Sequence, residues 1–157
     1  MANFKTNAMR ILDSAKIKYN VYTYDADGDF DGQSVAKKIG IEPERVYKTL
    51  VTVAPSKNYY VFVVPVLNEL DLKACAKAVG EKSVEMIHVK DINKVTGYIR
   101  GGCSPIGMKK QYRTVIDDSC LTFDAIVFSA GKIGYQVELS PNELVNLIGA
   151  DVQKISR

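Results

Sequence analysis

Two short stretches of the sequence carry residues whose type and spacing could do chemistry. The first is Lys48, a single ammonium within the strand-like run 46–53, where alternation places it on a face with apolar side chains. A lone charge there must be paired, reach water at a rim, or serve a site. The second is the loop 101–107, which has three glycines and a proline in seven residues. Its amides could bind an anion or form an oxyanion hole, although an ordinary tight turn is the plainer alternative.

Cys103 lies inside the glycine-rich loop and is a candidate nucleophile. A catalytic cysteine needs a basic partner, and the sequence does not place His88, the only histidine, beside it. We therefore favour Cys103 as a buried small hydrophobe and His88 as a packed histidine. One histidine and three widely spaced cysteines also argue against a zinc site. With no triad, carboxylate pair or metal centre in the pattern, we expect no cofactor and no metal.

An acidic loop resembles half of a calcium site. Asp27, Asp29, Asp31 and Gly32 match positions 1, 3, 5 and 6 of an EF-hand loop. Position 12 should be a bidentate glutamate, and it is Lys38. The preceding segment also has a strand pattern rather than a helical one. We therefore expect a solvated acidic loop rather than a calcium site.

The elements that must position these residues alternate irregularly along the chain. Helices are expected at 4–18 with Asn3 as N-cap, at 34–39, at 70–79 with Asn68 as N-cap, as a turn at 91–96, and from Ser140 to Gly149. Strands are expected at 19–24, 46–53, 59–64, 84–89, 114–116, 125–129 and 135–139. The turn residues between 46–53 and 59–64 predict a hairpin, with Pro65 near the end of its second strand. Without regular βαβ alternation, we expect one α+β domain over residues 1–157 with a curled, mixed sheet.

Composition limits the possible functions. The chain has 157 residues, of which 46% are hydrophobic and 25% charged, as in a soluble globular domain. It has no apolar run that could span a bilayer and no signal-peptide core, so we expect a cytoplasmic protein without a membrane partner. An odd number of cysteines fits a reducing compartment. The net charge of +3 is too small to predict a DNA-binding protein, although a protein that holds one end of an RNA needs few phosphate contacts.

Three segments together resemble the YbaK/EbsC family of aminoacyl-tRNA editing domains, also called the prolyl-tRNA-synthetase-associated family. They are Arg45–Leu50, the T-G-Y-x-x-G-G-x-S-P-x-G run Thr96–Gly107, and Ser129–Gly134. Their order and spacing also match, and the resemblance covers essentially the whole chain. It implies a β-barrel-like mixed sheet surrounded by helices, and trans-editing of mischarged tRNA. Over its full length the chain is similar to the Cys-tRNA(Pro) deacylase branch.

The resemblance also implies roles for individual residues. Lys48 takes the position of the key cation, and Gly101 lies where the family's backbone contacts the aminoacyl group. Substrate binding is implied for Tyr24, Gly102, Ser104 and Gln136. Relatives often carry an aspartate where this chain has Gln136, which puts in question any role there that requires a carboxylate.

The implied chemistry needs no catalytic triad. The thiol of the substrate's own cysteine attacks the ester carbonyl, a cyclic thiolactone forms and the tRNA leaves. Lys48 would anchor the substrate, and amides near Gly101 and Gly102 would stabilise the oxyanion. The implied partners are the 3′ end of mischarged tRNA(Pro), with Cys-tRNA(Cys) as a further substrate, and prolyl-tRNA synthetase. An Ala-tRNA(Pro) deacylase and a non-catalytic RNA-binding or regulatory module remain as alternatives.

Overall fold

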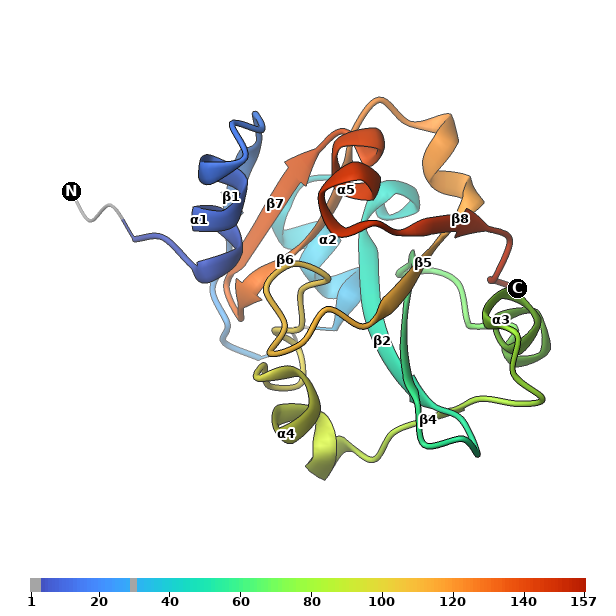
Figure 1. Cartoon of the computed structure of the whole chain (residues 1–157). Helices are drawn as coiled ribbons and strands as arrows, with labels where there is room; N and C mark the ends of the chain where they lie inside the picture. The colour runs from blue at the N-terminus through green and yellow to red at the C-terminus, as the bar shows by residue number, and fades with distance from the viewer. Residues whose placement is uncertain (1–3, 29–30) are drawn as a thin grey trace.

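A five-stranded mixed sheet forms the centre of the fold in the computed structural model, which describes residues 4–28 and 31–157 (Figure 1). Its strand order is β4-β2-β3-β5-β8, with β4–β2–β3 antiparallel and β3–β5–β8 parallel. The strands are β2 (Tyr47–Val53), β3 (Tyr59–Pro65), β4 (Glu85–Met86), β5 (Arg113–Asp117) and β8 (Asp151–Gln153). The predicted hairpin is confirmed as β2 and β3, and Pro65 is the last residue of β3.

A second sheet of three antiparallel strands lies across one face of the first. It has the order β1-β7-β6 and consists of β1 (Asn20–Thr23), β7 (Tyr135–Leu139) and β6 (Ile126–Lys132). A parallel bridge between Val46 and Val127 connects it to the start of β2. The two sheets curl around a shared core without closing, which confirms the expected barrel-like α+β fold.

Both faces of the five-stranded sheet are buried. One face, with Val63 and Ile116, packs with the second sheet, α1 (Asn7–Ser14) and α5 (Pro141–Ile148). The other face, with Phe62 and Val64, packs against α3 (Leu72–Val79). Burial on both sides explains why β3 is a continuous apolar run instead of an alternating one.

Two predicted helices have other boundaries than expected. α1 begins at Asn7 with Thr6 as its N-cap and ends at Ser14, because Lys16 takes a left-handed conformation with φ 59°. Asn3, the predicted cap, lies outside the described residues. α3 is capped by Asp71 rather than Asn68, and the Asp71 carboxylate accepts the Ala74 N–H at 3.1 Å.

The remaining helices match the expectations more closely. α2 (Gly32–Ile39) ends at Gly40, α4 (Ile92–Thr96) is the expected turn, and α5 begins after Ser140 and stops at Gly149. Short 3-10 turns lie at 43–45, 89–91 and 118–122. Within residues 4–28 and 31–157, no helix combines the length and the apolar character needed to cross a membrane.

Candidate functional site

An open pocket of about 920 Å³ lies beside the free edge of β2. Its walls come from segments far apart in the sequence: the end of β1, the start of α2, β2, the region of β4 and α4, the glycine-rich loop, and β6 with β7. It collects four of the six predicted site residues, together with Cys103 of the candidate loop. These are Tyr24, Lys48, Gly101 and Gln136.

Lys48 lies on the apolar face of β2 that the sequence predicted. It pairs with Val64 of β3, and on the same face Leu50 pairs with the buried Phe62. β4 covers the other edge of β2 only at Thr52 and Val53, so the edge beside Lys48 opens into the pocket. The ammonium makes no hydrogen bond or ion pair within residues 4–28 and 31–157. A half-buried cation without a partner is available to an anionic or polar ligand.

Two residues that line the pocket have a buried hydroxyl group with no hydrogen-bond partner in the described part of the chain. They are Tyr24 and Thr49. Leaving a buried polar group unpaired costs about 1–3 kcal/mol, so native proteins rarely do so without a reason. Both hydroxyls belong to residues that line the same pocket.

The glycine-rich loop enters the pocket through a tight turn. Gly102 donates its N–H to the Ile99 carbonyl at 2.9 Å, and Gly101 sits at the third position of this turn with φ +86°. Residues with a side chain rarely adopt that conformation, so the turn requires glycine at 101. The Gly102 amide is used inside the turn, which removes it from the predicted oxyanion site. The Gly101 N–H has no hydrogen-bond partner in the described chain.

Tyr98 holds the loop against β6, which explains one glycine in each of two of the three sequence segments. A Cβ atom at Gly107 would lie 2.9 Å from the Tyr98 hydroxyl, and one at Gly131 would lie 2.9 Å from Tyr98 Cε1. The Tyr98 hydroxyl donates to the Ile106 carbonyl at 2.5 Å, and burial raises its pKa to about 12. The ring therefore locks between two close backbone approaches and fixes the loop relative to the sheet.

Cys103 lines the pocket but is poorly suited to attack a substrate. Its sulfur lies 3.9 Å from the Thr96 hydroxyl and 3.8 Å from the Ile99 carbonyl. Burial raises the pKa of the Cys103 thiol, and the contact with Thr96 offsets this only in part. A raised pKa keeps the sulfur protonated near neutral pH, and the thiolate is the nucleophilic form.

Gln136 faces the pocket from the centre of the second sheet. It pairs with Tyr22 on one side and with Ser129 on the other, and Ser129 also lines the pocket. Its side-chain amide has no hydrogen-bond partner among the residues that the structure describes. A neutral amide can both donate and accept a hydrogen bond, so it can bind a polar group without adding charge.

Two of the predicted substrate-binding residues lie behind the wall of the pocket. Ser104 is fully buried, and its hydroxyl accepts the Ile106 N–H at 3.3 Å. A Cβ atom at Gly102 would approach Ile133 N to 3.3 Å. In this structure both residues shape the loop, and neither lines the pocket.

His88 and the acidic loop are two further features that the sequence singled out. His88 is exposed at the start of a 3-10 turn, so the expectation of a packed histidine was wrong. Asp31 caps α2 by accepting the Ser34 N–H at 3.0 Å, which lowers the pKa of Asp31. The Lys38 ammonium donates to the carbonyls of Asp25 and Asp27, each at 3.0 Å. No cluster of three acidic, cysteine or histidine residues suited to a metal occurs in the described part of the chain, and Asp29 lies outside it.

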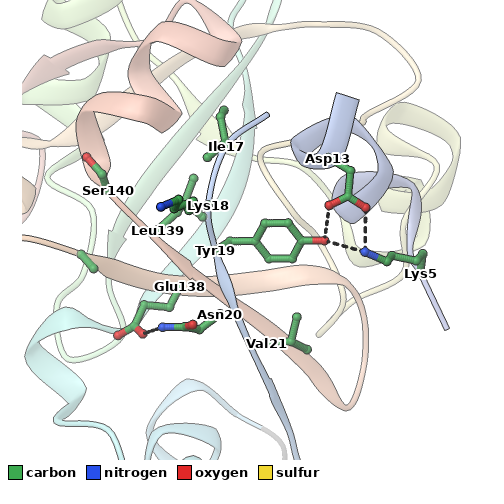
Figure 2. Close-up of a pocket in the computed structure, with 11 residues that line it drawn as sticks. Lys5, Asp13, Ile17, Lys18, Tyr19, Asn20, Val21, Glu138, Leu139 and Ser140 are labelled. Atoms are coloured by element: carbon green, nitrogen blue, oxygen red, sulfur yellow. Dashed lines mark hydrogen bonds and ion pairs between the residues drawn. The ribbon is translucent and has the colours of Figure 1, made fainter. Parts of the chain in front are cut away.

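A second hollow, of about 730 Å³, lies between α1, β1 and β7 (Figure 2). The polar side chains at its centre bind one another. Lys5 contacts Asp13 at 2.7 Å, Tyr19 donates to Asp13 at 2.9 Å, and Asn20 donates to Glu138 at 2.8 Å. We call this hollow, defined by these five residues, the paired cleft.

Among the pocket-lining residues that sequence reasoning did not assign to the site, three have polar side chains within or beside the resembling segments. They are Thr49, Arg100 and Ser129. Each lies inside one of the three segments that resemble the editing-domain family. Position in those segments was therefore the signal that could have identified them. The buried, unpaired state of the Thr49 hydroxyl depends on tertiary packing and leaves no mark in the sequence.

Two sequence comparisons find relatives of this chain. The sequence model of the aminoacyl-tRNA editing domain matches residues 30–147. A protein of Enterococcus faecalis named as a Cys-tRNA(Pro)/Cys-tRNA(Cys) deacylase, EbsC, is 47% identical over 153 residues, covering 97% of this chain and 93% of that protein.

Two solved structures have the same fold. The crystal structure of a hypothetical protein, APE2540, has a TM-score of 0.86 and 21% identity, covering 94% of this chain and 97% of that one. A structure described as a trans-editing enzyme for prolyl-tRNA synthetase has a TM-score of 0.83 and 23% identity, covering 98% and 99%. At 21% and 23% identity, these likenesses show a shared fold only.

Proposed function

This chain belongs to the aminoacyl-tRNA editing domain family, and from that premise we propose that it is a trans-editing deacylase that removes cysteine from mischarged Cys-tRNA(Pro). We extend the proposal to Cys-tRNA(Cys), because the relative that is 47% identical is named for both substrates. The observation that carries the proposal is the pocket, which brings an ammonium and two buried hydroxyls, all unpaired in the described chain, together with the glycine-rich loop.

The reaction we propose uses the thiol of the substrate. Its sulfur attacks the ester carbonyl carbon, the bond from that carbon to the ribose oxygen breaks, and the thiol proton ends on the ribose oxygen. The products are a cyclic thiolactone and a tRNA with a free terminal hydroxyl. A free thiol of pKa ~8.5 is already a fair nucleophile near neutral pH.

The thiols of the protein support this choice because all three are protonated at neutral pH. Burial raises the pKa of Cys75 to about 12 and that of Cys120 to about 11, and it also raises the pKa of Cys103. The protein then has to hold the aminoacyl-adenosine in a reactive pose. Orientation alone contributes roughly 7–11 kcal/mol in well-aligned intramolecular reactions.

We assign roles by what each pocket residue can still bind. Lys48 anchors the polar 3′ end of the substrate as an unpaired cation at the β2 edge. The Gly101 N–H, which has no partner in the described chain, donates to the developing oxyanion. The Tyr24 and Thr49 hydroxyls and the Gln136 amide bind the polar groups of the cysteine. Gln136 can accept from the substrate's amino group without the charge that an aspartate would add.

We also propose that prolyl-tRNA synthetase supplies the substrate. That enzyme charges tRNA(Pro), so the cysteinyl ester on this tRNA must come from its errors. Sedimentation of this protein with prolyl-tRNA synthetase and tRNA(Pro) would test for a complex, and separate boundaries at micromolar concentration would leave delivery to free diffusion.

The direct test is deacylation of two matched substrates. We expect release of cysteine from Cys-tRNA(Pro) well above the spontaneous rate without protein, and slower release of alanine from Ala-tRNA(Pro). Faster release of alanine would assign the chain to the sister activity. Tight tRNA binding without turnover of either ester would identify a non-catalytic module.

A further inference from the structure

The positive charge of the chain is concentrated in one segment. Residues 88–112 hold five Lys and Arg residues against one Asp, a net charge of +4, whereas the whole chain has +3. All other residues together therefore carry a net charge of −1. The five cations are Lys90, Lys94, Arg100, Lys109 and Lys110.

These cations are exposed and without acidic partners. None of the five forms an ion pair within residues 4–28 and 31–157. The next basic residue along the chain, Arg113, differs, because it lies 3.1 Å from the Asp151 carboxylate. A cluster of like charges without counter-charges is electrostatically unfavourable, and a polyanion relieves that repulsion.

The five cations share one surface because the segments that carry them are bonded together. The Lys109 N–H donates to the Thr96 carbonyl at 3.0 Å, and the Lys109 ammonium donates to the Lys94 carbonyl at 3.4 Å. The turn that contains Lys90 leads directly into α4, and Arg100 follows α4 by four residues. In Figure 1 α4 lies at the lower end of the molecule, well away from α3. We call these five residues the basic surface.

The basic surface continues into the pocket. Arg100 lines the pocket, and so do Met86 and Val89, whose side chains are 45% and 57% exposed. Ile99, beside Arg100, is also 57% exposed. Apolar side chains at the mouth of a pocket next to cations fit a nucleotide, which presents both a base and a phosphate.

We propose that the basic surface binds the phosphates of the tRNA acceptor end while the terminal aminoacyl-adenosine enters the pocket. This inference rests on the proposed function. The acceptor end is a polyanion that must approach the pocket from outside, and Arg100 of the basic surface lines the pocket. Each neutralised phosphate releases counterions, so the binding should weaken steeply with salt.

The test compares two triple variants with equal charge change. One is Lys90→Ala/Lys94→Ala/Lys110→Ala. The control is Lys73→Ala/Lys77→Ala/Lys154→Ala, which removes three exposed lysines on and near α3. None of the six side chains makes a hydrogen bond or ion pair in the described chain, so both variants should fold, which circular dichroism can verify.

Two substrates separate this surface from the chemistry of the pocket. We expect the basic-surface variant to deacylate subsaturating Cys-tRNA(Pro) at least about tenfold more slowly, with the salt dependence of tRNA affinity reduced by about 2–3 in slope. Its rate on cysteinyl-adenosine, which lacks the tRNA body, should match that of the control variant. If both triple variants act equally on the tRNA ester and keep the wild-type slope, the surface does not bind tRNA. If the unaltered protein cleaves neither ester, the proposed function fails instead.

Discussion

The paired cleft and the pocket both hold polar side chains among apolar neighbours, and they differ in what those side chains bind. In the paired cleft Lys5, Asp13 and Tyr19 bind one another, and Glu138 binds Asn20 and Arg45. In the pocket the Lys48 ammonium and the hydroxyls of Tyr24 and Thr49 bind nothing in the described chain. Polar groups satisfied within the protein contribute to folding, whereas groups left unsatisfied contribute to binding a ligand.

Replacing Lys48 should produce the largest functional effect. We expect Lys48→Ala to lower single-turnover deacylation of Cys-tRNA(Pro) at least about 10²-fold, the size seen when one electrostatic donor is removed from an active site. The midpoint of thermal unfolding should hardly change, because Lys48 has no partner to lose. The matched control is Lys5→Ala, which removes a paired lysine from the other hollow. Equal deacylation rates for the two variants would contradict the claim that only the pocket with the unpaired lysine binds the substrate.

Gly101→Ala should have the next largest effect. The added methyl group strains a residue held at φ +86°, at a cost of about 1–2 kcal/mol. A shift of the ester by about 1 Å can cost roughly 10²-fold in rate. Gly80→Ala is a matched control, since Gly80 has φ +74° with open space around it and lies at the end of α3. Equal loss of activity in both variants would mean that the substitution affects only global stability. Wild-type rates in Gly101→Ala would mean that the loop is an ordinary turn with no role in the reaction.

Removing Arg45, the ion-pair partner of Glu138 in the paired cleft, should lower the free energy of unfolding and leave the deacylation rate unchanged. Burial alone would raise the pKa of Glu138, but hydrogen bonds from Asn20, Arg45 and Tyr22 lower it overall. Arg45→Ala leaves this carboxylate largely buried without its cation, and we expect a loss of about 2–3 kcal/mol in the free energy of unfolding at pH 7.

The pH dependence of that loss has a definite sign. A carboxyl whose folded pKa is lowered stabilises the fold above its unfolded pKa of about 4.3, and this contribution disappears as the pH falls through the folded pKa. Urea unfolding at pH 7 and at low pH should therefore show a gap between wild type and Arg45→Ala that narrows on acidification. A gap that widens would contradict the assignment.

The smallest effect is expected at Cys103. Cys103→Ala should keep deacylation within about threefold of wild type, because its thiol is held protonated by burial and the nucleophile belongs to the substrate. Mass spectrometry of trapped reactions would detect the result that contradicts this prediction. A cysteinyl adduct on Cys103 would make the protein's thiol the nucleophile.

Local patterns predicted the elements whose signals are contained within one segment. The hairpin of β2 and β3 followed from alternation and its turn residues, and α5 followed from Ser140 and Pro141. β8 was missed because Asp151–Gln153 has no pattern of its own and forms by parallel pairing with β5, far away in the sequence. The predicted strand 84–89 shrank to Glu85–Met86 because β2 offers it only two partners.

The candidate site was predictable where one residue conflicted with its surroundings. Lys48 stood out as a charge on an apolar strand. The glycine-rich loop also stood out, but its pattern favoured an ordinary tight turn, and the role of Gly101 came from the family resemblance. Tyr24 and Gln136 came only from the family resemblance, since a tyrosine and a glutamine in strands are unremarkable. The unpaired hydroxyl of Thr49 and the use of the Gly102 amide inside its own turn depend on tertiary contacts.

The central claim is that this pocket positions a substrate whose own thiol does the chemistry. The most direct measurement is the single-turnover rate of deacylation of Cys-tRNA(Pro) beside that of Ser-tRNA(Pro), which differ by one atom. A thiol is a few per cent ionised near pH 7 and a hydroxyl essentially not at all, so the cysteinyl ester should react at least about 10²-fold faster. Equal rates for the two esters would contradict thiol assistance and point to a water activated by the protein.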